Sequence, residues 1–159
     1  MALKVTILSR HDAVAFCHKP NNSKERTVMI SISDPNMIYT SAPFVSKDNG
    51  LLSILRLSFS DADHAGEDVY KNQVDEALLM SAEDGDKVAA FLETYRPDAV
   101  IVHCDAGISR SSGVGAAIEK FYNGSDERIF GSYLYCPNML CYRVTLEARM
   151  RRHLHDTGT

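Results

Sequence analysis

Residues 99–122 read AVIVHCDAGISRSSGVGAAIEKFY, and this stretch decides the fold class. It opens with the short apolar run 99–103, which is typical of a strand buried on both faces of a parallel sheet. Residues 111–122 place small and apolar side chains on one face, which predicts a helix that stops at Asn123-Gly124. A loop with a cysteine, a glycine and an arginine joins the two. A strand that leads through a loop into a helix is the basic unit of an α/β fold.

Three further strands are expected before this unit, at residues 4–9 (KVTILS), 27–33 (TVMISIS) and 51–59 (LLSILRLSF). Each is rich in β-branched or apolar residues, and Asp34-Pro35-Asn36 ends the second strand with turn chemistry. Residues 61–80 are expected to be loop with some helix.

Two more helices are expected. Residues 81–84 (SAED) resemble a capping box for a helix that ends before Pro97, and Pro137-Asn138 opens a last amphipathic helix. Its basic residues should complement the helix dipole: Arg149, Arg151, Arg152, His153 and His155. Strands alternating with helices predict an α/β domain with a central, mainly parallel sheet flanked by helices.

Composition sets the broad class of the protein. The chain has 159 residues, 45% hydrophobic and 24% charged, which suits one globular domain over residues 1–159. No stretch approaches the ~20 apolar residues of a membrane-spanning helix, and the first residues lack a signal-peptide pattern. We therefore expect a cytoplasmic protein with no membrane partner. The net charge of −4 makes nucleic acid an unfavourable partner but leaves room for one small anion site.

The loop between residues 103 and 111 carries the chemistry. Ligand sites in open α/β sheets lie where strands lead into helices, and a helix N-terminus offers unpaired N–H groups and about half a positive charge. Gly107 permits a turn that a side chain would obstruct, and Arg110 adds a planar fork of donors that matches phosphate oxygens. Cys104 would lie at the bottom of this anion site.

The loop resembles the signature sequence of the cysteine-based protein tyrosine phosphatases. His103 to Ser111 (HCDAGISRS) matches H-C-x-x-G-x-x-R-S at every fixed position. The sequence looks most like the small dual-specificity branch, in particular its compact bacterial and phage-like members. A weaker resemblance extends from Leu51 to Leu146. The resemblance implies a three-layer domain and hydrolysis of phosphomonoesters without a metal or cofactor.

The resemblance also implies a role for each residue of the loop. Cys104 would be the nucleophile that forms a phosphocysteine, and Arg110 would bind the phosphate. Ser111 would hydrogen-bond the thiolate, although read alone it is an ordinary helix N-cap. His103 would support the loop through backbone hydrogen bonds. The N–H groups facing the phosphate would come from Asp105, Ala106, Gly107, Ile108, Ser109 and Arg110.

A general acid is expected upstream of the loop. Asp61, at the end of LRLSFSD, is the best match, Asp63 is its close rival and Asp68 is a third candidate. The Asp61–Cys104 interval is long for this branch, and we attribute the excess to an insertion between Ala62 and Met80.

Four cysteines are present without CxxC or metal-finger spacing, so free thiols are expected. The sequence leaves open whether Cys17, Cys136 or Cys141 captures an oxidised Cys104 as a reversible disulfide.

The expected substrate is a phosphorylated protein or peptide. Phosphotyrosine leads, phosphoserine and phosphothreonine remain open, and Tyr39, Phe44 and Tyr70 could supply an aromatic rim. The loop holds no lysine, unlike typical phosphoinositide phosphatases of this superfamily. A non-catalytic phosphate-binding module and a phosphatase for RNA 5′-phosphates or other non-protein esters stay open. We expect a monomer.

Overall fold

Four parallel strands form the central sheet of the protein. The computed structural model describes residues 2–21, 23–35, 45–46, 49–67 and 73–156. The strands are β1 (Lys4–Leu8), β2 (Thr27–Ser33), β3 (Ile54–Ser58) and β6 (Ala99–His103), in the order β1-β6-β2-β3. Every pairing in this sheet is parallel, which confirms the predicted sheet type.

The two central strands are the most deeply buried ones. Every residue of β2 and β6 is buried, whereas the edge strands β1 and β3 are partly exposed. Both central strands begin and end at the residues predicted from sequence. The strand β6 is a continuous apolar run up to His103, and β2 is rich in β-branched and apolar residues and is followed by the turn residues Asp34-Pro35, so their ends are easy to locate.

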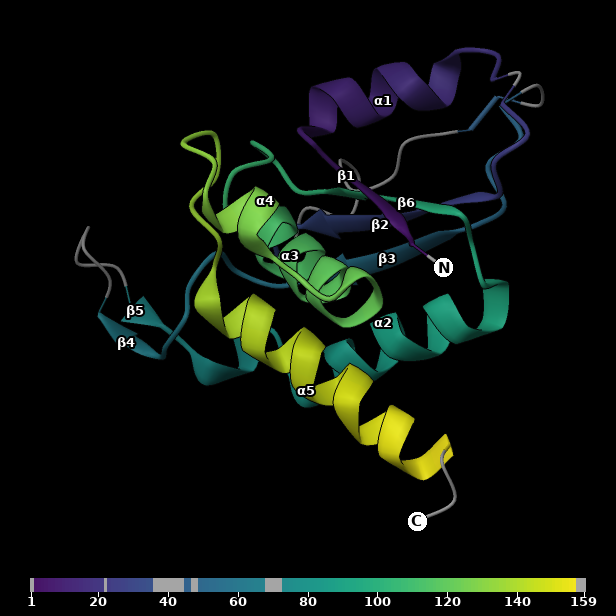
Figure 1. The fold of residues 1–159 in the computed structure, drawn as a ribbon. Coiled ribbons are helices and arrows are strands. Elements are labelled where there is room, and N and C mark those ends of the chain that lie inside the picture. The colour runs from purple at the N-terminus through teal and green to yellow at the C-terminus, as the bar shows by residue number, and fades with distance from the viewer. Residues whose placement is uncertain (1, 22, 36–44, 47–48, 68–72, 157–159) are drawn as a thin grey trace.

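Helices cover both faces of the sheet (Figure 1). One face carries α1 (Arg10–His18), and the other carries α2 (Ala82–Tyr95), α3 (Arg110–Asn123), α4 (Glu127–Phe130) and α5 (Met139–Asp156). The predicted capping box is present, because the side chains of Ser81 and Asp84 each accept a hydrogen bond from the other's backbone. The helix α1 was not predicted: its buried residues are only Ala13 and Cys17, which leave little periodic signal.

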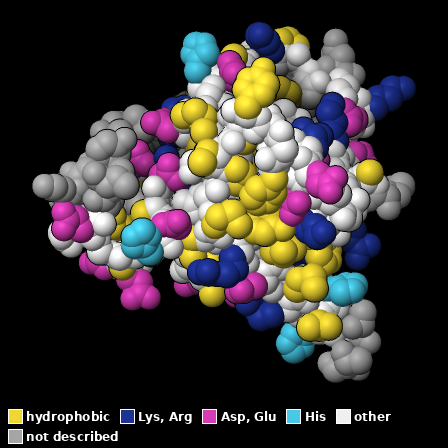
Figure 2. Space-filling view, turned by 60° about the vertical axis from the view of Figure 1, so that its left-hand side comes forward, with side chains coloured by type: hydrophobic (Ala, Val, Ile, Leu, Met, Phe, Trp, Pro, Cys, Tyr) yellow, Lys and Arg dark blue, Asp and Glu magenta, His cyan; other side chains and the backbone are white. Residues whose placement is uncertain are grey.

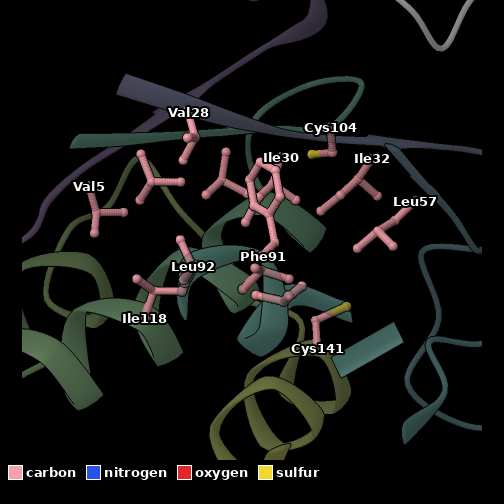
Figure 3. Packing of buried hydrophobic residues seen from close by; sticks show 14 of the residues in the cluster. Val5, Val28, Ile30, Ile32, Leu57, Phe91, Leu92, Cys104, Ile118 and Cys141 are labelled. Atoms are coloured by element: carbon pink, nitrogen blue, oxygen red, sulfur yellow. The ribbon is translucent and has the colours of Figure 1, made fainter. Parts of the chain in front are cut away.

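Side chains alternate between two cores along the strands. The larger core lies under α2, α3 and α5 and includes Val28, Ile30 and Ile32 of β2 (Figure 3). The smaller core lies under α1 and contains Met29 and Ile101 with residues of the helix. This alternation makes the domain a three-layer α/β structure.

The segment from Asp61 to Met80 differs from the prediction of loop with some helix. It contains an antiparallel pair of short strands, β4 (Gly66–Glu67) and β5 (Gln73–Val74), followed by the 3-10 helix Glu76–Leu78. Two-residue strands are too short for an alternating pattern, so the sequence gives no strand signal there.

Candidate active site

Three polar side chains follow the ends of neighbouring strands. Asp34 follows β2, Asp61 lies just beyond β3, and Cys104 follows β6. Because these strands are parallel and adjacent, their carboxyl ends meet at one edge of the sheet. Residues separated by up to 70 positions in the chain thus reach one site, at the N-terminus of α3.

The backbone of the loop is bent at Gly107. Its φ of 74° lies in the left-handed region, and a Cβ atom there would lie 2.7 Å from the backbone nitrogen of Ser9. The loop therefore packs directly against the junction of β1 and α1. A side chain at this position would be strained and would also push the loop off that junction.

The carbonyl groups of the loop hydrogen-bond with donors around it. The Cys104 carbonyl lies 3.1 Å from His103 Nδ1, and the Asp105 carbonyl accepts from the Arg10 backbone N–H at 3.0 Å. The carbonyls of Ile108 and Ser109 accept from backbone N–H groups of the α4–α5 connection, each at 2.9 Å.

These carbonyl positions orient the N–H groups. A trans peptide unit points its C=O and the following N–H in opposite directions, and the described residues contain no cis peptide bond. The N–H groups of Asp105, Ala106, Ser109 and Arg110 therefore face away from the surrounding donors and toward the inside of the loop. The loop forms a set of inward donors suited to an anion.

Cys104 lies at the base of this loop and is buried, with 2% of its surface exposed. Its Sγ lies 3.1 Å from Ser111 Oγ. Burial alone would raise the pKa of the thiol, but the Ser111 hydroxyl and backbone N–H groups of Ser111 and Gly107 stabilise the thiolate. The positive charge of Arg110 acts in the same direction, so the pKa of Cys104 lies below its usual value.

Ser111 does not cap the helix, so the N-cap interpretation is wrong. Ser109 occupies the N-cap position, and its side chain makes no capping hydrogen bond. Ser111 is a fully buried residue of the first turn of α3 whose hydroxyl faces Cys104.

The imidazole of His103 contacts the backbone of the loop. The residue is fully buried, and burial lowers the pKa of its imidazole, which favours the neutral ring. Because the Cys104 carbonyl can only accept, Nδ1 carries the proton. Nε2 then accepts from the hydroxyl of Ser31, its register partner on β2, at 2.7 Å.

The guanidinium of Arg110 is buried and only partly hydrogen-bonded. Its Nη1 donates to Asp34 Oδ1 at 2.6 Å and to the Phe59 carbonyl at 3.0 Å. Its Nε is buried and has no hydrogen-bond partner among the residues that the structure describes. A buried donor without a partner costs about 1–3 kcal/mol, so the site is suited to an acceptor that binds here.

Asp61 contacts the loop, whereas Asp63 does not. Asp61 Oδ1 accepts from Ser109 Oγ at 2.7 Å and from Asn138 Nδ2 at 3.2 Å. The exposed Asp63 pairs with its neighbour His64 at 2.6 Å. The geometry thus favours Asp61 over its rival. The third candidate, Asp68, and the suggested rim residues Tyr39, Phe44 and Tyr70 lie outside the described residues.

Two residues of the site were not identified from sequence as part of it. Asp34 was interpreted as a turn former and Asn138 as the start of a helix. Asn138 also donates to the Ala62 carbonyl and, from its backbone N–H, to the Ser109 carbonyl. It therefore links the general-acid candidate to the loop. An asparagine before a helix gives no local signal of such a contact.

The cysteines other than Cys104 have distinct surroundings. All four are free, as expected. Cys17 belongs to the core under α1, Cys141 belongs to the core that includes Cys104, and Cys136 is exposed. Burial raises the pKa of both the Cys17 and the Cys141 thiol. Of the three buried cysteines, Cys104 is therefore the one whose surroundings favour the reactive thiolate.

Metal and membrane features were also searched for. Within the described ranges, no group of three or more His, Cys, Asp or Glu side chains is placed to hold a metal ion. The described helices include none with the length and apolar character needed to cross a bilayer.

Comparison with known proteins gives structural matches alone, since no family model and no curated protein matches the chain. The human tyrosine phosphatase-like serine/threonine/tyrosine-interacting protein is similar at TM-score 0.50 and 19% identity, over 81% of this chain and 79% of that one. Tk-PTP in its active form is similar at TM-score 0.50 and 15% identity, over 93% and 92%. PTPMT1 in complex with PI(5)P gives TM-score 0.48 and 20% identity, over 82% and 80%. The chain has the fold of the cysteine-based tyrosine phosphatase superfamily.

Proposed function

We propose that this protein hydrolyses phosphate monoesters through a phosphocysteine formed on Cys104. The observation that carries this proposal is a thiol of lowered pKa together with a buried arginine whose Nε has no hydrogen-bond partner in the described part of the chain. The positive charge of Arg110 helps to lower the pKa of the Cys104 thiol, and both residues flank a loop whose N–H groups point inward. A thiolate is needed to attack phosphorus, and the guanidinium and N–H groups are needed to stabilise the phosphate oxygens.

In the first step the Cys104 thiolate attacks phosphorus, and a P–S bond forms as the P–O bond to the leaving group breaks. The leaving oxygen takes a proton from Asp61. Because Ser109 and Asn138 both donate to Oδ1, we place this proton on Oδ2. A phenolate has a pKa of ~10, so a proton at this point lowers the barrier substantially.

In the second step water attacks the phosphocysteine and Asp61 accepts a proton from it. The P–S bond breaks, phosphate leaves and the thiolate is restored. The Ser111 hydroxyl, 3.1 Å from Sγ, stabilises the departing thiolate. The lowered pKa of Cys104 favours this step, because a weaker base leaves more readily.

The surroundings of the loop support a phosphorylated protein or peptide as substrate. Exposed apolar side chains lie on the loop, on the α4–α5 connection tied to it and at the first residue of α5, namely Ile108, Tyr133, Leu134 and Met139. Acidic side chains gather around β4 and β5 beyond Asp61 (Figure 2). An acidic edge disfavours highly charged lipid headgroups and RNA. Turnover requires a reduced Cys104, which fits a cytoplasmic location.

Hydrolysis of an aryl phosphate with chelator present, between about pH 5 and 7.5, tests this proposal. We expect turnover in the native chain and none in Cys104→Ser. A folded protein that binds tungstate without turnover would instead indicate a phosphate-binding module. Faster turnover of RNA 5′-phosphates than of phosphopeptides would contradict the proposed substrate class.

A further inference from the structure

The two edges of the Arg110 guanidinium have different surroundings. On one edge, Nη1 donates to Asp34 Oδ1 and to the Phe59 carbonyl. The other edge includes Nε, which is buried and to which no described residue offers a hydrogen-bond acceptor. The Arg110 side chain is 6% exposed, whereas that of Asp34 is 46% exposed. Asp34 therefore reaches the buried arginine from the surface of the molecule.

Sheet topology places Asp34 beside the loop. β2 pairs with β6 so that Ser31 lies opposite His103. Asp34 comes just after the last residue of β2, as Cys104 does after β6.

Two acceptors on one nitrogen fix the plane of a guanidinium. An arginine side chain has about 2 kcal/mol of rotamer entropy, and a planar fork binds two phosphate oxygens only when its plane is correctly oriented. Because Asp34 and Phe59 hold Nη1, the orientation of the opposite edge of the guanidinium, which contains Nε, is fixed. An anion bound there would satisfy the unpartnered Nε.

We propose that Asp34 is a positioning residue for Arg110. It holds Nη1 so that the opposite edge of the guanidinium receives the oxyanion, and it does not itself touch the anion. This inference rests on the anion site of the proposed function but not on turnover. An alternative is that the Asp34 carboxylate occupies the anion site itself. It would then bind Nε, but its hydrogen bond is with Nη1.

Tungstate binding to Cys104→Ser protein, measured by calorimetry, tests the proposal without turnover. Asp34→Ala in this background should weaken tungstate binding about tenfold, because a hydrogen bond between charged groups is lost. Asp34→Asn should stay within about threefold, since the amide oxygen still accepts from Nη1. Asp63→Ala removes a nearby exposed carboxylate and should leave binding unchanged.

A second arm shows whether Asp34 acts through Arg110. In an Arg110→Lys background no guanidinium plane remains to be oriented, so Asp34→Ala should then change tungstate affinity less than twofold. Thermal unfolding of each variant checks folding, and Asp34→Ser replaces Asp34→Ala if the latter unfolds.

The outcomes separate this inference from the proposed function. Tungstate binding to Asp34→Ala as tight as in the parent, or an equal loss in the lysine background, overturns the positioning role. Failure of the parent to bind tungstate overturns the anion site and the positioning role together. A tenfold loss in Asp34→Ala, combined with no turnover in the native chain, retains the positioning role and rejects the hydrolase.

Discussion

At the scale of single residues, the hydroxyl of Ser111 is the main group that lowers the pKa of Cys104, the proposed nucleophile. A free thiol with a pKa of ~8.5 is only about 3% thiolate at neutral pH. The hydrogen bond at 3.1 Å between Ser111 and Cys104 favours the charged form and opposes the effect of burial. The same contact would serve both formation and release of the phosphocysteine.

Replacing Ser111 with alanine should raise the pKa of Cys104. The rate of alkylation by iodoacetate, followed against pH, should then show its midpoint at higher pH than in the native chain. Hydrolysis of an aryl phosphate should fall about tenfold, because a hydrogen bond to a charged group is lost. Ser112→Ala is the matched control, since that buried hydroxyl donates to carbonyls of the loop and not to sulfur. An unchanged alkylation midpoint in Ser111→Ala would contradict the assignment.

Asp61→Asn should separate substrates by their leaving groups. A phosphotyrosine peptide needs a proton on the leaving oxygen, so its turnover should fall about 100-fold. An aryl phosphate with an acidic phenol needs little help and should lose less than about tenfold. Asp63→Asn should affect neither substrate. Equal losses on both substrates in Asp61→Asn would remove the general acid from this position.

At the scale of helices and strands, α3 contacts the residue before α5 that binds Asp61, the proposed general acid. Gly113 of α3 packs against the backbone of Asn138, and a Cβ atom there would overlap the Asn138 carbonyl. Asn138 in turn holds Asp61. A glycine in the helix interior is thus explained by the close approach of a second element.

Gly113→Ala should displace Asn138 and lower both stability and activity. Overpacking of this kind costs about 1–3 kcal/mol, measurable as a lower midpoint of thermal or urea unfolding. Gly115→Ala on the same helix is the control, because the nearest atoms to its Cβ belong to the Ile7 side chain at 3.2 Å. Native phosphopeptide turnover in Gly113→Ala would show that Asn138 does not set the position of Asp61.

Ion pairs join α2 to α5. Glu93 of α2 accepts from Arg149 at 2.6 Å and from Arg152 at 2.7 Å. The Arg149 side chain is only 8% exposed, and its guanidinium lies 4.9 Å from the centre of the Phe121 ring. The sequence-based prediction was that these arginines complement the helix dipole. Their main contact in the structure is instead with Glu93.

The Glu93 pairs predict a pH-dependent stability. Hydrogen bonding from Arg152 is the main cause that lowers the pKa of Glu93 to about 2, with burial opposing and Arg149 assisting. Its unfolded value is about 4.3. The stabilisation is thus complete above about pH 4.3 and is lost as the pH falls through about 2.

Glu93→Gln should lower stability at neutral pH by about 2 kcal/mol, which shifts the midpoint of thermal unfolding by about 4–8 °C. The difference from the native chain should shrink as the pH approaches about 2. Glu83→Gln, at an exposed pair with Lys87, should have little effect. A difference that stays constant from pH 7 to about 2 would show that charge on Glu93 is not the cause.

At the scale of the whole molecule, the parallel sheet explains how the site is assembled. Its strand order brings the ends of β2, β3 and β6 together, so Asp34, Asp61 and Cys104 meet although they are distant in sequence. The helix α3 adds its N-terminus at the same edge. The topology of the sheet therefore brings the strand ends together, and each strand end contributes one residue to the site.

The sequence revealed the parts of this assembly whose signal is local. The strand β6 has a continuous apolar run, and β2 is rich in β-branched and apolar residues. The helix α2 has its capping box, and the loop between Cys104 and Arg110 has a fixed spacing. The contact of Asp34 with Arg110 joins residues 76 positions apart, and that of Asn138 with Asp61 joins residues 77 positions apart. No pattern within either segment encodes such a pairing, so only the folded chain reveals it.

The most direct test of the account is to trap the phosphocysteine. Native protein mixed with a phosphotyrosine peptide, quenched in acid and digested, should yield a peptide containing Cys104 whose mass has increased by one phosphoryl group. Ser111→Ala should accumulate more of this species, and Cys104→Ser should yield none. Turnover of the phosphopeptide with no phosphorylated Cys104 in either protein would contradict the account.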